Sequence, residues 1–150
     1  MSYTPSAKIL GRYADVLVNF ALGGGVGIAK GQVVHLSAAE SAKPLYVALR
    51  NAIIDAGGHV ISNYVPDSPH AKASLGRYFY EHAKDHQLDF FPEKYVRGLV
   101  DTIDYSIHVI SESNKKELEG IDAKKIMRRG MAWKPMRDWR NEKEHKGKFT

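Results

Sequence analysis

The chain contains no cysteine among its 150 residues. Disulfide bonds, cysteine-based zinc sites and a thiol nucleophile are therefore excluded. No apolar run is long enough to cross a bilayer, and the opening "MSYTPSAKIL" lacks the charged head and apolar stretch of a secretory signal. Hydrophobic residues make up 43% and charged residues 26%, as in ordinary globular domains. These features predict a soluble globular chain in the cytoplasm with no membrane partner.

Positive charge is concentrated at the C-terminal end of the chain. Residues 115–150 hold 12 Lys and Arg against 6 Asp and Glu, whereas the formal net charge of the whole chain is only +5. Trp133, Trp139 and Arg137 lie within this basic segment. Arginine can neutralise phosphates and tryptophan can stack on bases, so binding of nucleic acid through this segment is one alternative. Acidic residues interrupt the run, which favours packing of the tryptophans against the protein or a neighbouring segment.

Three β-branched segments alternate with longer segments of helical periodicity. We expect strands at residues 32–38, 59–65 and 105–111, because each is short and rich in Val and Ile. Crossovers of helical length between them imply a parallel sheet covered on both faces, with the first strand in the centre, the flavodoxin-like order. The helices between and around these strands are expected over residues 6–22, 43–56, 67–89 and 92–103, with Ser6 and Ser68 as N-caps.

The C-terminal segment reads as a turn followed by a helix from about Asp122 that is interrupted before Pro135. The sequence thus predicts a three-layer α/β domain over residues 1–113, with a mostly parallel sheet of about three strands. A basic helical extension over residues 114–150 follows this domain.

The glycine-rich stretch "ALGGGVGIAKGQVVHL" resembles a phosphate-binding loop only superficially. A dinucleotide fingerprint needs G-x-G-x-x-G between a strand and a helix. Here the last glycine comes one position late, at Gly31, and a helix precedes the loop while a strand follows it. We therefore interpret Gly23–Gly27 as a connection.

Two histidines four residues apart, His82 and His86, are predicted to lie on one helical face. This spacing can hold a metal ion, but the glutamate of an H-E-x-x-H motif is replaced by Ala83. Solvated surface histidines are the favoured interpretation. His35, His59 and His108 are expected within or at the edge of the sheet, and no catalytic or cofactor-binding set emerges from spacing alone.

The order of these segments is similar to the beginning of the thermophilic metalloaminopeptidases of the aminopeptidase T and S type. The similarity rests on "YADVLVNFAL", on Lys30-Gly31-Gln32-Val33-Val34, on Ala56-Gly57-Gly58 and on the pattern from Asn114 through Leu118 and Ile121 to Asp122. The "GGGVG" loop looks like an insertion relative to that family, and Gly58 stands where alanine is common.

The resemblance implies that residues 1–150 are an N-terminal, non-catalytic domain that shapes the catalytic cavity and assists assembly of a dimer. Divalent metals (zinc, cobalt or manganese) would bind to a catalytic C-terminal domain outside these residues, and peptide substrate would be bound by the full-length enzyme. Trp133, Trp139 and Arg137 are expected to contact that domain or another partner. A free-standing flavodoxin-like module that binds a small ligand, and a nucleic-acid-binding protein, remain the alternatives.

Overall fold

The computed structural model describes residues 5–67, 74–111 and 115–147. The chain divides into two compact units. The first unit includes residues 1–66, 103–111 and 147–150, and it contains the sheet. The second includes residues 67–102 and 112–146. The basic C-terminal segment therefore groups with residues 67–102, while the predicted division into domains at residue 113 stays a prediction.

The sheet of the first unit has three parallel strands in the order β2-β1-β3. These strands are β1 (Val33–Ala39), β2 (His59–Val65) and β3 (Tyr105–Val109). Val34 of β1 lies opposite Val60 on one side and Tyr105 on the other. The first strand is central, as predicted, and helices flank the sheet. This arrangement confirms the predicted α/β class and its strand order.

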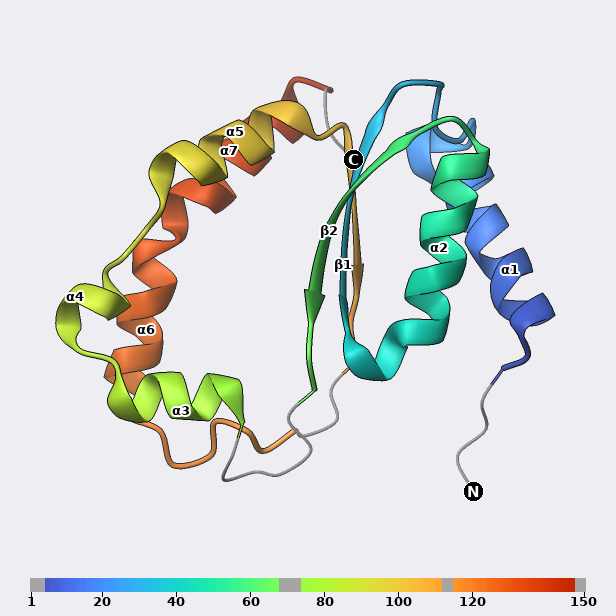
Figure 1. The fold of residues 1–150 in the computed structure, drawn as a ribbon. Helices are drawn as coiled ribbons and strands as arrows, with labels where there is room; N and C mark the ends of the chain where they lie inside the picture. The colour runs from blue at the N-terminus through green and yellow to red at the C-terminus, as the bar shows by residue number, and fades with distance from the viewer. Residues whose placement is uncertain (1–4, 68–73, 112–114, 148–150) are drawn as a thin grey trace. The chain divides into compact units, whose positions relative to one another are not determined.

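Helices α1 (Ala7–Val16) and α2 (Lys43–Asp55) cover one face of this sheet, with α2 beside the strands and α1 packed against α2 (Figure 1). Ser6 caps α1, as predicted, by accepting a hydrogen bond from the backbone N–H of Ile9, and Pro44 lies in the first turn of α2, where proline is tolerated. Apolar residues at helical spacing on α1 and α2 meet alternate residues of β1. The fully buried core consists of Ala14, Val18, Val34, Leu36, Leu49 and Ile53.

The connection from α1 to β1 is a sequence of unusual turns. A π-helical turn (Leu17–Ala21) continues α1, and a 3₁₀ turn (Leu22–Gly24) follows it. Gly25 and Gly27 then adopt positive φ angles of 98° and 76°, which favour glycine. The backbone N–H of Ile28 returns to the carbonyl oxygen of Val18 at 3.1 Å, which fastens the loop to the end of the helix.

The second unit begins with α3 (Leu75–His82), α4 (Asp85–Leu88) and α5 (Glu93–Thr102). The prediction of a single helix over residues 67–89 was wrong, because Ala83 and Lys84 take extended backbone angles between α3 and α4. The hydroxyl of Ser74, which is fully buried, accepts a hydrogen bond from the N–H of Arg77 and caps α3. The predicted cap at Ser68 lies outside the described residues.

Helices α6 (Ala123–Ala132) and α7 (Lys134–His145) form the C-terminal part of this unit. Asp122 caps α6 through the N–H of Lys124, and the helix breaks at Trp133, just before Pro135, as the sequence predicts. Arg77 connects α3 to the segment that precedes α6, because its guanidinium donates to the carbonyl oxygens of Glu117 and Glu119. The second unit is thus held together by contacts between distant parts of the chain.

Candidate functional site

Trp133 and Trp139, both predicted as contact residues, lie together in an aromatic cluster of the second unit. Their rings lie 5.4 Å and 5.7 Å from the ring of Phe91, measured between centroids. Arg129 stacks 5.0 Å above the Trp133 ring, and Arg97 stacks 5.1 Å above the Trp139 ring. Such stacking is attractive because the ring face carries negative charge. The two tryptophans therefore share one aromatic neighbour within the unit.

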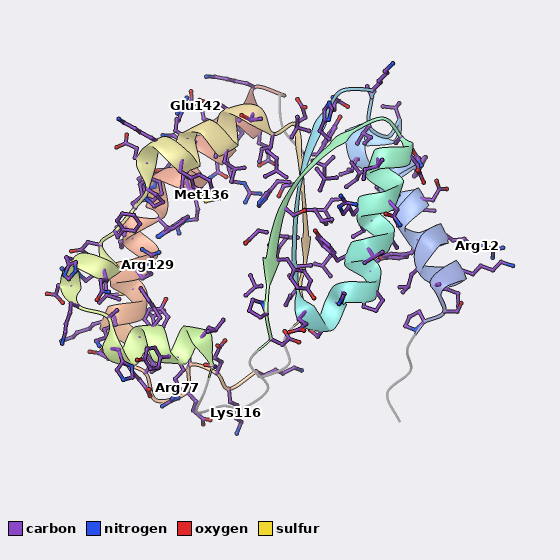
Figure 2. All side chains as sticks on the ribbon, viewed as in Figure 1. Arg12, Arg77, Lys116, Arg129, Met136 and Glu142 are labelled. Carbon is purple, nitrogen blue, oxygen red and sulfur yellow. The ribbon has the colours of Figure 1, made fainter. Side chains whose placement is uncertain are left out.

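Several cations of the basic segment bind groups of the second unit. Figure 2 shows Arg129 on α6, where its guanidinium donates to the carbonyl oxygen of Phe90. Lys125 donates to the carbonyl oxygen of Tyr80 at 2.7 Å, and Lys143 donates to that of Val100 at 2.7 Å. These hydrogen bonds from cationic side chains stabilise the second unit internally. Arg137 is exposed on α7, and its predicted contact with a partner, like that of the two tryptophans, stays a prediction.

Arg128 forms the most extensive ionic contact of this segment. Its Nη1 lies 2.9 Å from a carboxylate oxygen of Asp85, while Nε and Nη2 donate to the two oxygens of Asp89 at 2.7 Å and 2.6 Å. The hydrogen bonds and positive charge of Arg128 lower the pKa of the Asp89 carboxyl below its ordinary value. The side chain of Arg128 thus connects α6 to α4 and to Asp89, the residue that ends α4.

The two histidines His82 and His86 do not share a helical face. His82 ends α3, and His86 lies in α4 beyond the break at Ala83 and Lys84. The His82 ring stacks on Tyr78 with centroids 4.0 Å apart, and its Nδ1 lies 2.9 Å from the Tyr78 carbonyl oxygen. Sequence spacing alone failed here because the helix that would align the two residues is interrupted.

Residues 5–67, 74–111 and 115–147 bring together no group of three or more His, Asp or Glu that could hold a metal ion. The described residues therefore do not fit a metal centre, and we assign no metal-dependent step to them. In the same ranges, no helix combines the length and hydropathy needed to span a membrane.

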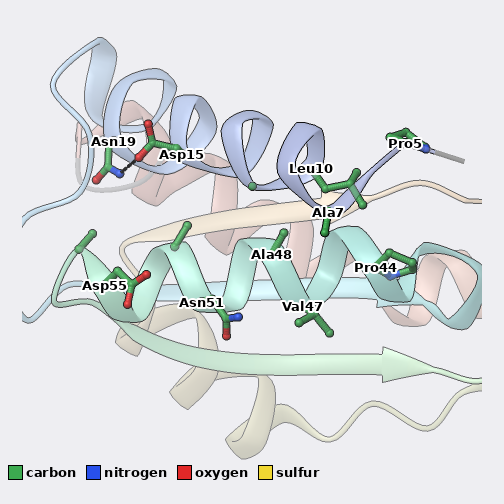
Figure 3. A pocket seen from close by; sticks show the side chains of 13 residues that line it. Pro5, Ala7, Leu10, Asp15, Asn19, Pro44, Val47, Ala48, Asn51 and Asp55 are labelled. Atoms are coloured by element: carbon green, nitrogen blue, oxygen red, sulfur yellow. Dashed lines mark hydrogen bonds between the residues drawn. The ribbon is translucent and has the colours of Figure 1, made fainter.

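A groove of about 720 Å³ lies between α1 and α2 in the first unit. Figure 3 shows Asp15 on α1 and Asn19 on the π-helical turn at the same end as Asp55 on α2, with Pro5 and Pro44 at the opposite end. The amide of Asn19 donates to Asp15 at 2.6 Å. Small residues of both helices also line the groove, namely Ala7, Gly11, Ala48, Ala52 and Ala56, and no lining residue is basic. The volume is in the range of small-ligand sites.

The groove was not predicted from the sequence. Its two walls come from helices that are separated by β1, and the helical spacing of small residues on each wall is also typical of ordinary helix packing. The sequence does contain one signal for this groove. Gly11 lies in the middle of α1, and the acidic residues Asp15 and Asp55 lie near the C-terminal ends of α1 and α2. That signal becomes meaningful only when the two helices are known to be neighbours.

The described residues form an open parallel sheet with a central first strand, and a pair of helices lies at the C-terminal end of the second unit. The sequence model of the thermophilic metalloprotease (M29) family matches residues 6–150. The chain belongs to this family, which confirms the resemblance inferred from its segment order. Among solved structures, wild-type AmpT from Thermus thermophilus matches with a TM-score of 0.71 at 20% identity. That match covers 95% of this chain and 35% of AmpT. A comparison with curated proteins gives no match.

Proposed function

We propose that residues 1–150 form a non-catalytic, N-terminal domain of a cytoplasmic, metal-dependent aminopeptidase. The observation that carries the proposal is the family match over residues 6–150, together with a structural match that takes 95% of this chain but only 35% of AmpT. In the proposed full-length enzyme, divalent zinc, cobalt or manganese ions bound by the remaining chain would supply the hydrolytic chemistry. The absence of cysteine accords with a reducing compartment.

The catalytic part of the same protein is the proposed partner of this domain. An apolar stripe on α1 and the turn that follows it supports such a contact: Ile9, Tyr13, Val16 and Phe20 recur at helical spacing and are 48–63% exposed. Arg12, between two of them, also projects outward from α1 (Figure 2). A contiguous apolar face on a helix otherwise in contact with α2 favours burial against another protein surface. Through such a contact the domain would shape the catalytic cavity and assist assembly of a dimer.

A direct test is hydrolysis of leucyl-p-nitroanilide by the 150-residue chain with added zinc, cobalt or manganese. We expect no release of p-nitroaniline above that of metal and buffer alone. Hydrolysis that increases with the concentration of the chain and is removed by a chelator would show that the chain is catalytic, contrary to the proposal.

The second test is the coding sequence. We expect the reading frame to continue beyond the codon of Thr150 into a segment that supplies His, Glu and Asp ligands. A stop codon at this position would remove the catalytic partner and contradict the assignment to a longer peptidase.

A further inference from the structure

We propose that the groove between α1 and α2 binds a short, extended peptide segment that carries apolar residues at one end and Lys or Arg at the other. This site lies within the first unit and does not depend on the catalytic role proposed above. The charge, shape and composition of the groove support this assignment.

The charge of the groove selects a cation. Asp15 and Asp55 both lie at the end that Figure 3 places opposite the two prolines, and no lysine, arginine or histidine lines the groove. Among the residues that the structure describes, no ion pair joins either aspartate to a basic side chain. Arg12, three residues before Asp15, projects outward from α1 (Figure 2). Two carboxylates therefore face solvent at this end without a cation.

The position of Asp55 increases this preference. It is the last residue of α2, and the last turn of that helix contains no basic residue. The C-terminal end of a helix carries partial negative charge, so a carboxylate there is repelled and a cation is attracted. An ammonium or guanidinium group bound between Asp15 and Asp55 would offset both negative charges. The negative charges at this end of the groove are therefore unfavourable in the free protein, and a bound cationic ligand would reduce their repulsion.

The opposite end of the groove is apolar. Pro5, Leu10, Pro44 and Val47 line it, and the small side chains between the two ends leave the middle open. Pro44 to Asp55 spans about 16 Å of helix axis at a rise of 1.5 Å per residue. An extended peptide of about five residues has the same length at roughly 3.3 Å per residue. The side-chain amides of Asn19 and Asn51 also line the groove and can pair with peptide N–H and C=O groups.

Gly11 supports a role for the open middle of the groove. It lies inside α1, where glycine disfavours the helix relative to alanine. A Cβ atom added to Gly11 would meet nothing within 4 Å, so neither packing nor a positive φ requires glycine at this position. The missing side chain leaves space for a ligand in the groove.

The experiment is an NMR titration of the ¹⁵N-labelled chain with the acetylated, amidated peptide Leu-Ala-Leu-Lys-Lys. We expect saturable shifts of the amides of the groove-lining residues. The matched peptide Leu-Ala-Leu-Glu-Glu should produce no such shifts. No saturable binding of the lysine peptide at millimolar concentration, or equal binding of both peptides, would overturn the proposal. Hexylamine is titrated in parallel, and equal affinity for it would overturn the assignment to a peptide.

Variants locate the site. Asp15→Asn and Asp55→Asn should each weaken binding of the lysine peptide about two- to fivefold, the range expected for a solvent-exposed ion pair. Glu119→Gln removes the same charge in the second unit and should leave affinity unchanged. If all three substitutions weaken binding equally, the attraction is a property of net charge and the groove is not the site.

Gly11 provides the test of shape. Gly11→Leu should fill the groove and abolish binding, whereas Gly11→Ala should retain most of the affinity and raise thermal stability. Circular dichroism checks that both variants are folded. Unchanged affinity in a folded Gly11→Leu variant would place the peptide elsewhere and overturn the proposal. If Gly11→Leu does not fold, Ala48→Leu on the opposite wall serves the same purpose.

Discussion

The Cβ position of Gly27 lies 2.5 Å from the backbone carbonyl oxygen of Asn19. The loop between α1 and β1 therefore touches the end of the helical segment so closely that no side chain fits between them. This contact is reinforced by the hydrogen bond from the N–H of Ile28 to the carbonyl oxygen of Val18, a core residue. Gly27 thus serves close packing of the loop against the end of the helical segment.

Replacing Gly27 should be much more damaging than replacing a neighbouring glycine. Gly27→Ala combines a positive φ of 76° with a clash against backbone, which cannot move aside like a side chain. We expect a loss of about 3 kcal/mol or more in the free energy of unfolding, measured by urea titration. Gly25→Ala is the control: its φ is 98°, but its Cβ would meet nothing within 4 Å, so about 1–2 kcal/mol is expected. Equal losses would mean that the close approach is unimportant.

The ionic fork of Arg128 should make stability depend on pH in the acid range. The pKa of Asp89 in the folded protein is lowered from its ordinary value of 3.8. The stabilisation that its contact with Arg128 provides is therefore fully present above pH 3.8, and it is lost as the pH falls through the lower pKa of the folded state. Arg128→Gln should therefore be less stable than the parent at pH 6, and the difference should shrink below pH 3.8. Urea unfolding at several pH values measures it. Arg137→Gln, an equal change of charge at an exposed site, should show no such convergence.

Phe91 should control the environment of both tryptophans at once. Its ring contacts Trp133 and Trp139, which are the only two tryptophans of the sequence. Phe91→Leu should lower the free energy of unfolding by about 1–2 kcal/mol and shift tryptophan emission to longer wavelength, because aromatic contacts are lost. Phe90→Leu is a matched control, since the adjacent Phe90 side chain is 61% exposed. Equal effects of the two substitutions would contradict a shared aromatic cluster.

Local signals in the sequence identify most of the first unit. Ser6, the β-branched segments and the proline of α2 each act within a few residues, and the strand order follows from right-handed crossovers. The interruption of a periodic segment and the contacts between distant residues were not predicted. The break at Ala83 and Lys84 interrupts a segment whose periodicity looked continuous. Phe91 stands more than 40 residues before the tryptophans that it contacts, and the two walls of the groove come from helices that β1 separates in the sequence.

Gly58 is explained by a long-range contact of the same kind. In the metalloaminopeptidases that the sequence resembles, alanine is common at this position, so Gly58 departs from their pattern. In this chain a Cβ atom at Gly58 would lie 2.7 Å from Cδ1 of Ile28 and 3.0 Å from Cγ2 of Ile53. Ile28 comes directly after the loop that looks like an insertion, and it packs against the core of the first unit. Its terminal methyl group occupies the space that an alanine at position 58 would need.

A double-mutant cycle tests this relationship. Ile28→Val removes Cδ1 and alone should cost about 1 kcal/mol of unfolding free energy. Gly58→Ala alone should also destabilise, because its new methyl group meets Ile28 and the buried Ile53. With Ile28→Val present, the closest clash is gone, so the double variant should be more stable than the sum of the single losses by about 1 kcal/mol. Pairing Gly58→Ala with Ile54→Val, whose side chain is 48% exposed, should instead give additive losses. Additivity in both cycles would show that Ile28 does not determine the residue tolerated at position 58.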